Sequence, residues 1–202
     1  NNLEETADIL QKIYQYENLN YIEKQKLILL ETSLDIKQNL SPSYEIIEKI
    51  YDALSLTKSN IDILNVDKMP LSIQEINLIS FLAIIFSMEG KLDEAIEIDE
   101  KLVKCFDFYK VKSLKQNATL IIILSHLVQF YEEKKLYIKA LQTCEKVLNI
   151  SKDTIYNPFF SEICFTKGRL LYTIGKKEEG IAILKDIYPY FKLVGNDYLV
   201  SV

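Results

Sequence analysis

The feature that most restricts the fold is a pattern of large, small and aromatic residues that occurs three times at one internal spacing. The three copies are Leu82, Ala83, Phe86, Gly90 and Ala95; Leu127, Val128, Tyr131, Lys135 and Ala140; and Lys167, Gly168, Leu171, Gly175 and Gly180. Separations of three and four residues place side chains on one face of a helix. Small residues let two helices approach closely. The pattern therefore predicts three pairs of packed helices.

Composition favours an all-α fold for the whole chain. Five Gly and four Pro among 202 residues are too few for many short strands joined by tight turns. A hydrophobic share of 49% and a charged share of 26% are typical of a globular protein. At this length we expect one repeat array rather than two independent domains.

Apolar periodicity and capping signals predict about nine helices. They are expected at Leu3–Tyr16, Ile22–Ile36, from the Ser41–Pro42 cap onward, 72–88, Leu92–Phe106, 113–133, Leu136–Ile150, from Asn157–Pro158 to Gly175, and Lys177–Leu193. The three recognisable pairs occupy residues 72–193, whereas residues 1–57 form divergent amino-terminal helices.

Two of these helices carry a capping box at the amino end. Ser72 with Glu75, and Ser113 with Gln116, have the spacing at which side chain and backbone amide satisfy each other. The run Ile121–Ile123 is β-branched, but the apolar pattern continues beyond a typical strand length, which predicts a helix packed between neighbours.

Tyrosine is abundant, with 13 residues. On the third helix, Tyr44, Ile47, Tyr51 and Leu54 have the spacing of a buried stripe. We therefore interpret Tyr44, Tyr51 and also Tyr131 as packing residues rather than platforms for stacking nucleic-acid bases.

Charge and cysteine content limit the function classes. The net charge is −5 and basic residues do not cluster, so this chain alone should not bind duplex DNA. Cys105, Cys144 and Cys164 are widely spaced and His126 is the sole histidine, so we expect buried thiols, no metal and a cytoplasmic location. No apolar run is long enough for a membrane span.

The repeated pattern resembles the tetratricopeptide repeat, although successive copies lie 45 and 40 residues apart rather than the usual 34. The resemblance implies a right-handed α-solenoid. The segments Gly168–Tyr172, Gly175–Ile181 and Tyr190–Gly195 are further similar to the carboxy-terminal end of the Rgg/PlcR-type peptide-pheromone regulators. That family joins a helix-turn-helix DNA-binding domain to a tetratricopeptide-like domain that receives a short signalling peptide.

This second resemblance spans residues 71–200 and is strongest after Phe159. It implies a homodimeric sensor for quorum sensing that reaches DNA only through a domain absent from this chain. Since the sequence begins at Asn1 without Met, we expect it to be cut from a longer protein, with the helix-turn-helix upstream.

In such a solenoid the first helices of the pairs line the concave face. The polar positions expected to contact a peptide there are Asn77, Ser80, Asn117, Ser125, His126, Gln129, Glu162, Thr166, Arg169 and Tyr172. Asn and Gln can pair with a peptide backbone, and Arg169 can hold a carboxylate through two hydrogen bonds. His126 stands where the family often has a clamping Asn, and can add pH sensitivity near neutrality. For each position, an ordinary solvated or interhelical polar residue is the alternative reading.

No nucleophile arrangement, glycine-rich phosphate loop or cofactor motif is recognisable, so we expect a binding protein rather than an enzyme. The main alternative is a constitutive scaffold that holds the tail of a partner protein. A helix-turn-helix encoded immediately upstream of Asn1 would favour the regulator over the scaffold. A peptide-inhibited phosphatase of related architecture is a third hypothesis, which an assay with a response regulator would test.

Overall fold

The structure is a computed structural model that describes residues 12–13, 19–38, 43–108, 113–152 and 159–193. Within these ranges the chain forms eight α-helices and two short 3-10 helices and no strand. The chain divides into two compact units, Asn1–Cys105 and Phe106–Val202. The predicted helix over 3–16 lies outside the described residues except for 12–13, as do the Ser41–Pro42 cap and the Asn157–Pro158 helix start.

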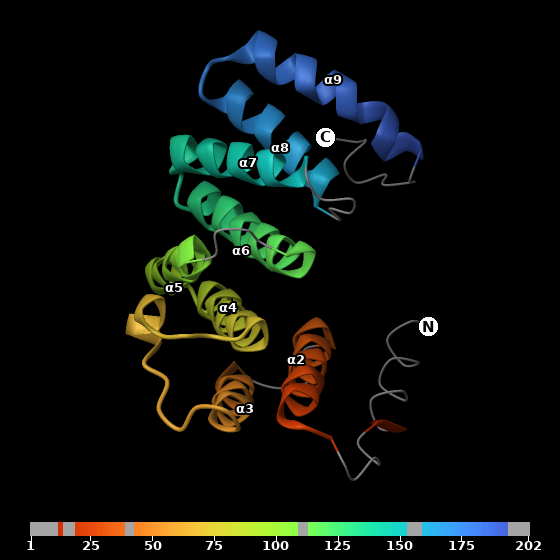
Figure 1. Ribbon diagram of the computed structural model, residues 1–202. Helices are drawn as coiled ribbons and strands as arrows, with labels where there is room; N and C mark the ends of the chain where they lie inside the picture. The colour runs from red at the N-terminus through yellow and green to blue at the C-terminus, as the bar shows by residue number, and fades with distance from the viewer. Residues whose placement is uncertain (1–11, 14–18, 39–42, 109–112, 153–158, 194–202) are drawn as a thin grey trace. The chain divides into compact units, whose positions relative to one another are not determined.

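The first unit contains four described α-helices and a 3-10 helix (Figure 1). They are α2 (Tyr21–Gln38), α3 (Ser43–Ser55), η1 (Ile63–Lys68), α4 (Ile73–Met88) and α5 (Leu92–Cys105). Helix α4 packs against α2, α3 and α5, so it is the central element of this unit. Its apolar residues are buried around most of its circumference, as expected for such a position.

In the second unit, η2 (Phe106–Phe108) precedes four helices that are stacked in chain order (Figure 1). They are α6 (Leu114–Glu133), α7 (Tyr137–Ser151), α8 (Phe160–Thr173) and α9 (Lys177–Leu193). Each of them packs against the next. The run Ile121–Ile123 lies inside α6, which confirms the helical interpretation of this β-branched segment.

The repeated sequence pattern corresponds to one backbone motif that occurs three times. Gly90, Lys135 and Gly175 all have positive φ, at 77°, 59° and 93°. In each case the amide of the next residue donates to a carbonyl five residues earlier, on Phe86, Tyr131 and Leu171, at 2.8, 2.7 and 2.9 Å. This bond is the signature of the Schellman motif, which ends a helix and reverses the chain.

Apart from the glycines at the turns, the small residues of the pattern are buried in each pair. Ala95 and Ala140 are fully buried in the first turn of the second helix. A Cβ at Gly180 would stand 2.5 Å from the Gly168 carbonyl oxygen and 2.8 Å from the Tyr172 amide nitrogen. Backbone atoms cannot move aside, so only glycine permits the contact between α8 and α9. The prediction that small residues bring the helices together is confirmed for α8 and α9.

Both predicted capping boxes are present. The Ser72 hydroxyl accepts from the Glu75 amide at 3.2 Å, while the Glu75 carboxylate accepts from the Ser72 amide at 2.6 Å. The same exchange joins Ser113 and Gln116 at 3.3 and 2.8 Å. Helices α4 and α6 therefore begin where the sequence predicts, because each box satisfies two amides that a helix start leaves without partners.

A polar chain that is buried at Gln25 and Glu75 and exposed at Thr57 connects α2, α3 and α4. The Gln25 amide donates to the Ala53 carbonyl at 3.0 Å and to the Thr57 hydroxyl at 2.9 Å. Thr57 donates in turn to Glu75 at 2.8 Å, and Glu75 belongs to the capping box of α4. Burial strengthens the bond from Gln25 to Ala53 in particular, so the chain helps to fix how the three helices pack.

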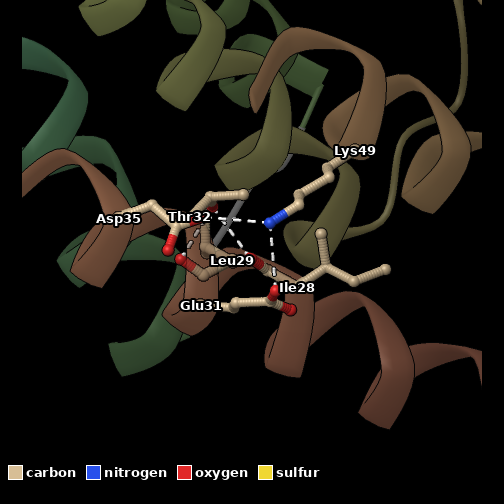
Figure 2. A network of polar contacts seen from close by, with 6 residues as sticks. All are labelled: Ile28, Leu29, Glu31, Thr32, Asp35 and Lys49. Carbon is tan, nitrogen blue, oxygen red and sulfur yellow. Dashed lines mark hydrogen bonds and ion pairs between the residues drawn. The ribbon is translucent and has the colours of Figure 1, made fainter. Parts of the chain in front are cut away.

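A second network joins α2 to α3 nearer the surface (Figure 2). The Lys49 ammonium on α3 lies between two carboxylates of α2, 3.0 Å from Glu31 and 2.9 Å from Asp35. On the same stretch of α2, the Thr32 hydroxyl donates to the carbonyls of Ile28 and Leu29 at 2.8 and 3.1 Å. Lys49 thus bridges two turns of α2.

The predicted buried stripe of α3 is wrong for its tyrosines. Tyr44 is 62% exposed and Tyr51 is 43% exposed. The residues buried on α3 are Ile46, Ile50, Ala53 and Leu54. Both sets have helical spacing, but the aliphatic set can be buried completely, whereas a tyrosine hydroxyl needs a polar partner. Tyr44 finds that partner at the surface, where it donates to Glu45 at 3.1 Å. Tyr131 is buried, as predicted.

The segment between α3 and α4 contains η1, which none of the helices expected from the sequence covers. Asp62 caps this 3-10 helix by accepting from the Leu64 amide at 3.0 Å. Lys101 of α5 donates to the Leu64 carbonyl at 2.5 Å. A bond from a residue far along the chain stabilises η1, so local sequence signals could not reveal it.

Candidate functional site

The first unit carries two of the predicted peptide contacts, both on α4. Asn77 is half-buried, whereas Ser80 is buried at 3% exposure. Ser80 therefore does not have the outward position that the repeat template assigns to it. Burial among apolar neighbours is the physical reason, because α4 is covered on several sides.

Four predicted contacts lie on α6 in the second unit, and they differ in exposure. Asn117 in the first turn is half-buried, His126 is half-buried and Gln129 is exposed. Ser125 is buried at 4% exposure and its hydroxyl donates to the Ile121 carbonyl at 2.8 Å. Its hydrogen bond is satisfied inside the helix, so Ser125 also departs from the expected outward position.

The remaining four lie on α8. Glu162, Arg169 and Tyr172 are exposed, and Thr166 is half-buried. Glu162 accepts a hydrogen bond from the Ser161 hydroxyl at 2.9 Å. Positions 162, 166, 169 and 172 recur at helical spacing, so they share one face of α8.

Arg169 connects this face of α8 to α6. One guanidinium nitrogen forms an ion pair with Glu132, and the other donates to the second Glu132 oxygen at 2.8 Å. The Arg169 side chain is 45% exposed and that of Glu132 is 21% exposed. Two parallel bonds between a guanidinium and a carboxylate form the strongest and most directional type of ion pair. Arg169 therefore already holds a carboxylate, one that belongs to the chain itself.

Two further electrostatic interactions involve residues of α7. Lys167 lies 3.5 Å from Glu145 on α7. Burial, followed by the negative charge of Glu132, raises the pKa of the Cys144 thiol to about 12. The Glu132 carboxylate thus binds Arg169 near the surface and also raises the pKa of the buried Cys144 thiol on α7.

Sequence reasoning missed Glu132. In the repeat template, Glu132 corresponds to Tyr172, and Arg169 corresponds to Gln129. The pair therefore joins two different template positions in successive repeats. To predict this pair, one must know how the first helices of neighbouring repeats are offset along their axes. The residue spacing within one repeat does not contain that information.

The exposed face of α6 and α8 offers hydrogen-bond donors and acceptors together with one guanidinium. Gln129 supplies an amide that can both donate and accept, and Arg169 keeps N–H groups beyond those bound to Glu132. Among the described residues no group of His, Cys, Asp and Glu could hold a metal ion. In the same part of the chain, no helix is both long enough and apolar enough to cross a membrane.

Comparison with solved structures shows the fold. The chain is similar to Bacillus thuringiensis PlcR, solved in complex with the peptide PapR7 and DNA, at a TM-score of 0.80 and 14% identity. The match covers 100% of this chain and 69% of that chain.

Two further solved structures are also similar. They are the TPR-like repeats of a Podosopora anserina putative kinesin light chain (TM-score 0.60, 13% identity, 96% and 87% covered) and BtubC from P. vanneervenii (0.66, 14%, 95% and 72%). No family model and no curated protein sequence matches the chain. The fold is tetratricopeptide-like and all-α, as predicted.

Proposed function

We propose that this chain is the ligand-sensing and dimerisation domain of a cytoplasmic transcriptional regulator, and that a short signalling peptide binds it. The observation that carries the proposal is the exposed polar face of α6 and α8, where Arg169 is held in a geometry suited to a carboxylate. The similarity to PlcR, which was solved with a peptide and DNA, supports it.

The proposed contacts in the second unit are Gln129, Glu162, Thr166, Arg169 and Tyr172, with His126 and Asn117 nearer the interior. An extended peptide exposes a donor and an acceptor on every residue, and side-chain amides can bind both. Exposed aromatic rings supply apolar contact area. In the first unit, Asn77 is the proposed contact, and it is tested on its own.

The test is affinity selection from a random-sequence pool of short synthetic peptides, followed by calorimetry with the retained peptides. We expect Gln129→Ala and Arg169→Ala each to weaken binding about tenfold, the usual effect of removing a well-placed polar contact. Asn77→Ala measures the contribution of the first unit separately.

The matched control is Lys185→Ala, which removes an exposed cation from α9 and should leave binding unchanged. If the wild-type chain retains no peptide, the proposed function is wrong. Unchanged affinity in both Gln129→Ala and Arg169→Ala would exclude this face. Sedimentation measurements that show only monomers would contradict the proposed dimerisation.

A constitutive protein-interaction scaffold is the second candidate, because two of the similar structures are of TPR-like repeats from a putative kinesin light chain. A scaffold would hold the tail of a partner protein continuously and would need no DNA-binding domain. The two candidates predict different coding sequences upstream of Asn1, because only a regulator requires a helix-turn-helix to be encoded there.

A further inference from the structure

We propose that Glu132 is an internal competitor that occupies Arg169 until the carboxylate of a bound peptide displaces it. This inference rests on the proposed function and adds to it the chemical group that is recognised and a device that sets the affinity. The ligand class is a peptide with a free carboxylate, either at its carboxy terminus or on an acidic side chain.

The geometry of the Glu132–Arg169 pair is suited to exchange of one carboxylate for another. Arg169 contacts both oxygens of Glu132 through its two terminal nitrogens, with 2.8 Å for the Nη2 bond. A guanidinium presents its donors in a fixed plane that matches a carboxylate. Any carboxylate that reaches this point from solvent can therefore adopt the same two-bond arrangement without a change in Arg169.

The two side chains of the pair differ in their exposure to solvent. The Arg169 side chain is 45% exposed, so a ligand can reach its donors, while Glu132 is more enclosed at 21%. Gln129 precedes Glu132 by three residues and Thr166 precedes Arg169 by three residues. Each of them therefore lies one helical turn away on the same face. A peptide whose carboxylate binds Arg169 can place its backbone beside these polar groups.

The two-bond geometry makes this pair strong for an ion pair near the surface, but its partial exposure limits its net contribution, since solvent screens the charges and both side chains lose freedom. Displacement of Glu132 therefore costs the ligand only a modest factor in affinity, about twofold to fivefold. The pair is strong enough to orient Arg169 and weak enough to exchange.

Displacement also has a consequence inside the second unit. The Glu132–Arg169 pair is a direct side-chain link between α6 and α8. When a ligand carboxylate replaces Glu132, that link is lost and the ligand becomes the bridge instead. Binding is thereby coupled to the contact between α6 and α8. A local change of this type can bias a larger conformational equilibrium.

The experiment uses the full chain and three pools of random short peptides. The first pool lacks Asp and Glu and ends in a free carboxylate, the second is the same pool with carboxamide ends, and the third is amidated but contains one Asp or Glu. Retention is measured for the wild type, Glu132→Gln and Arg169→Gln. The control variant is Glu145→Gln, which removes one negative charge from α7 and breaks the ion pair with Lys167.

We expect Glu132→Gln to bind carboxylate peptides about twofold to fivefold more tightly, with no change for fully amidated ones. Arg169→Gln should lose the preference for carboxylates, and Glu145→Gln should behave as the wild type. Preference for the first or the third pool identifies whether the terminal or a side-chain carboxylate is bound.

Peptide binding without any carboxylate preference would overturn this inference and leave the proposed function standing. The same is true if Glu145→Gln matches Glu132→Gln, because net charge would then explain the effect. Absence of binding to every pool would overturn both. Circular dichroism and thermal melting of each variant confirm that the chains compared are folded.

Discussion

At the scale of single residues, Lys135 is in a conformation that lysine rarely adopts. Its φ of 59° matches the glycines at the same position in the other two repeats. A left-handed conformation costs an L-residue about 1 kcal/mol or more relative to glycine. We expect Lys135→Gly to increase the free energy of unfolding by about 1 kcal/mol in urea titrations. Lys134→Gly, at the ordinary φ of −75°, should instead decrease it.

Gly180 provides the opposite case, because no larger residue fits there. A Cβ would stand 2.5 Å from the Gly168 oxygen. We expect Gly180→Ala to lower the free energy of unfolding by about 2 to 4 kcal/mol, since α8 and α9 must separate. A Cβ at Gly175 would meet no atom within 4 Å. Gly175→Ala should therefore lower the free energy of unfolding only by the conformational strain, about 1 kcal/mol. Equal losses in the two variants would refute the close-approach explanation.

Cys144 should be chemically inert in the folded chain. Its thiol is buried, and burial together with Glu132 raises its pKa from 9.0 to about 12. At pH 8 we expect iodoacetamide to modify the half-buried Cys164 before Cys144, as mapped by mass spectrometry. Modification of Cys144 at the rate of a free thiol would contradict the burial.

The raised pKa also gives Cys144 an alkaline pH dependence. The folded state binds its proton more tightly than the unfolded state, so this contribution is complete below pH 9 and is lost as the pH rises toward 12. Stability should fall by at most about 1.4 kcal/mol per pH unit in this window on account of Cys144. Cys144→Ala should show a shallower decline.

At the scale of elements, the Lys49 bridge tests how side chains fix α2 against α3. Burial lowers the pKa of Lys49, but the hydrogen bonds that Lys49 donates to Asp35 and Glu31 outweigh it and hold the pKa above 10.5. This stabilisation is present below that pH and is lost as the pH rises further. We expect Lys49→Met to lower the free energy of unfolding by about 1 kcal/mol at low salt, and less at about 1 M salt.

The control for this prediction is Lys176→Met. Lys176 lies 3.4 Å from Glu179, and both side chains are more than half exposed. Such a pair should contribute almost nothing. If Lys176→Met lowers the free energy of unfolding as much as Lys49→Met does, the bridge between two turns of α2 does not stabilise the fold more than an ordinary surface ion pair.

Element boundaries were largely predictable because they depend on local chemistry. The capping serines Ser72 and Ser113, and the turns at Gly90 and Gly175, act within a few residues of themselves. The buried face of α3 was not predictable, since the sequence offers two stripes with helical spacing and the packing partner α2 selects between them. Helix η1 was missed for the same reason, because Lys101 supports it from α5.

At the scale of the whole molecule, the fold could be predicted further than the site. Repeat spacing specified helix pairs, and the comparisons bear out that class. Spacing alone did not show that Ser80 and Ser125 are buried or that Glu132 already binds Arg169. Those properties depend on how successive pairs are packed, which no single repeat encodes.

Peptide binding by the exposed face of α6 and α8 can be tested directly. The most direct measurement is photo-crosslinking with short peptides that carry one photoreactive residue, followed by mass-spectrometric mapping of the modified positions. We predict that the crosslinks fall within Leu114–Glu133 and Phe160–Thr173, and that unlabelled peptide suppresses them. Crosslinks confined to α7 and α9 or to the first unit, or crosslinks that excess unlabelled peptide does not suppress, would contradict the claim.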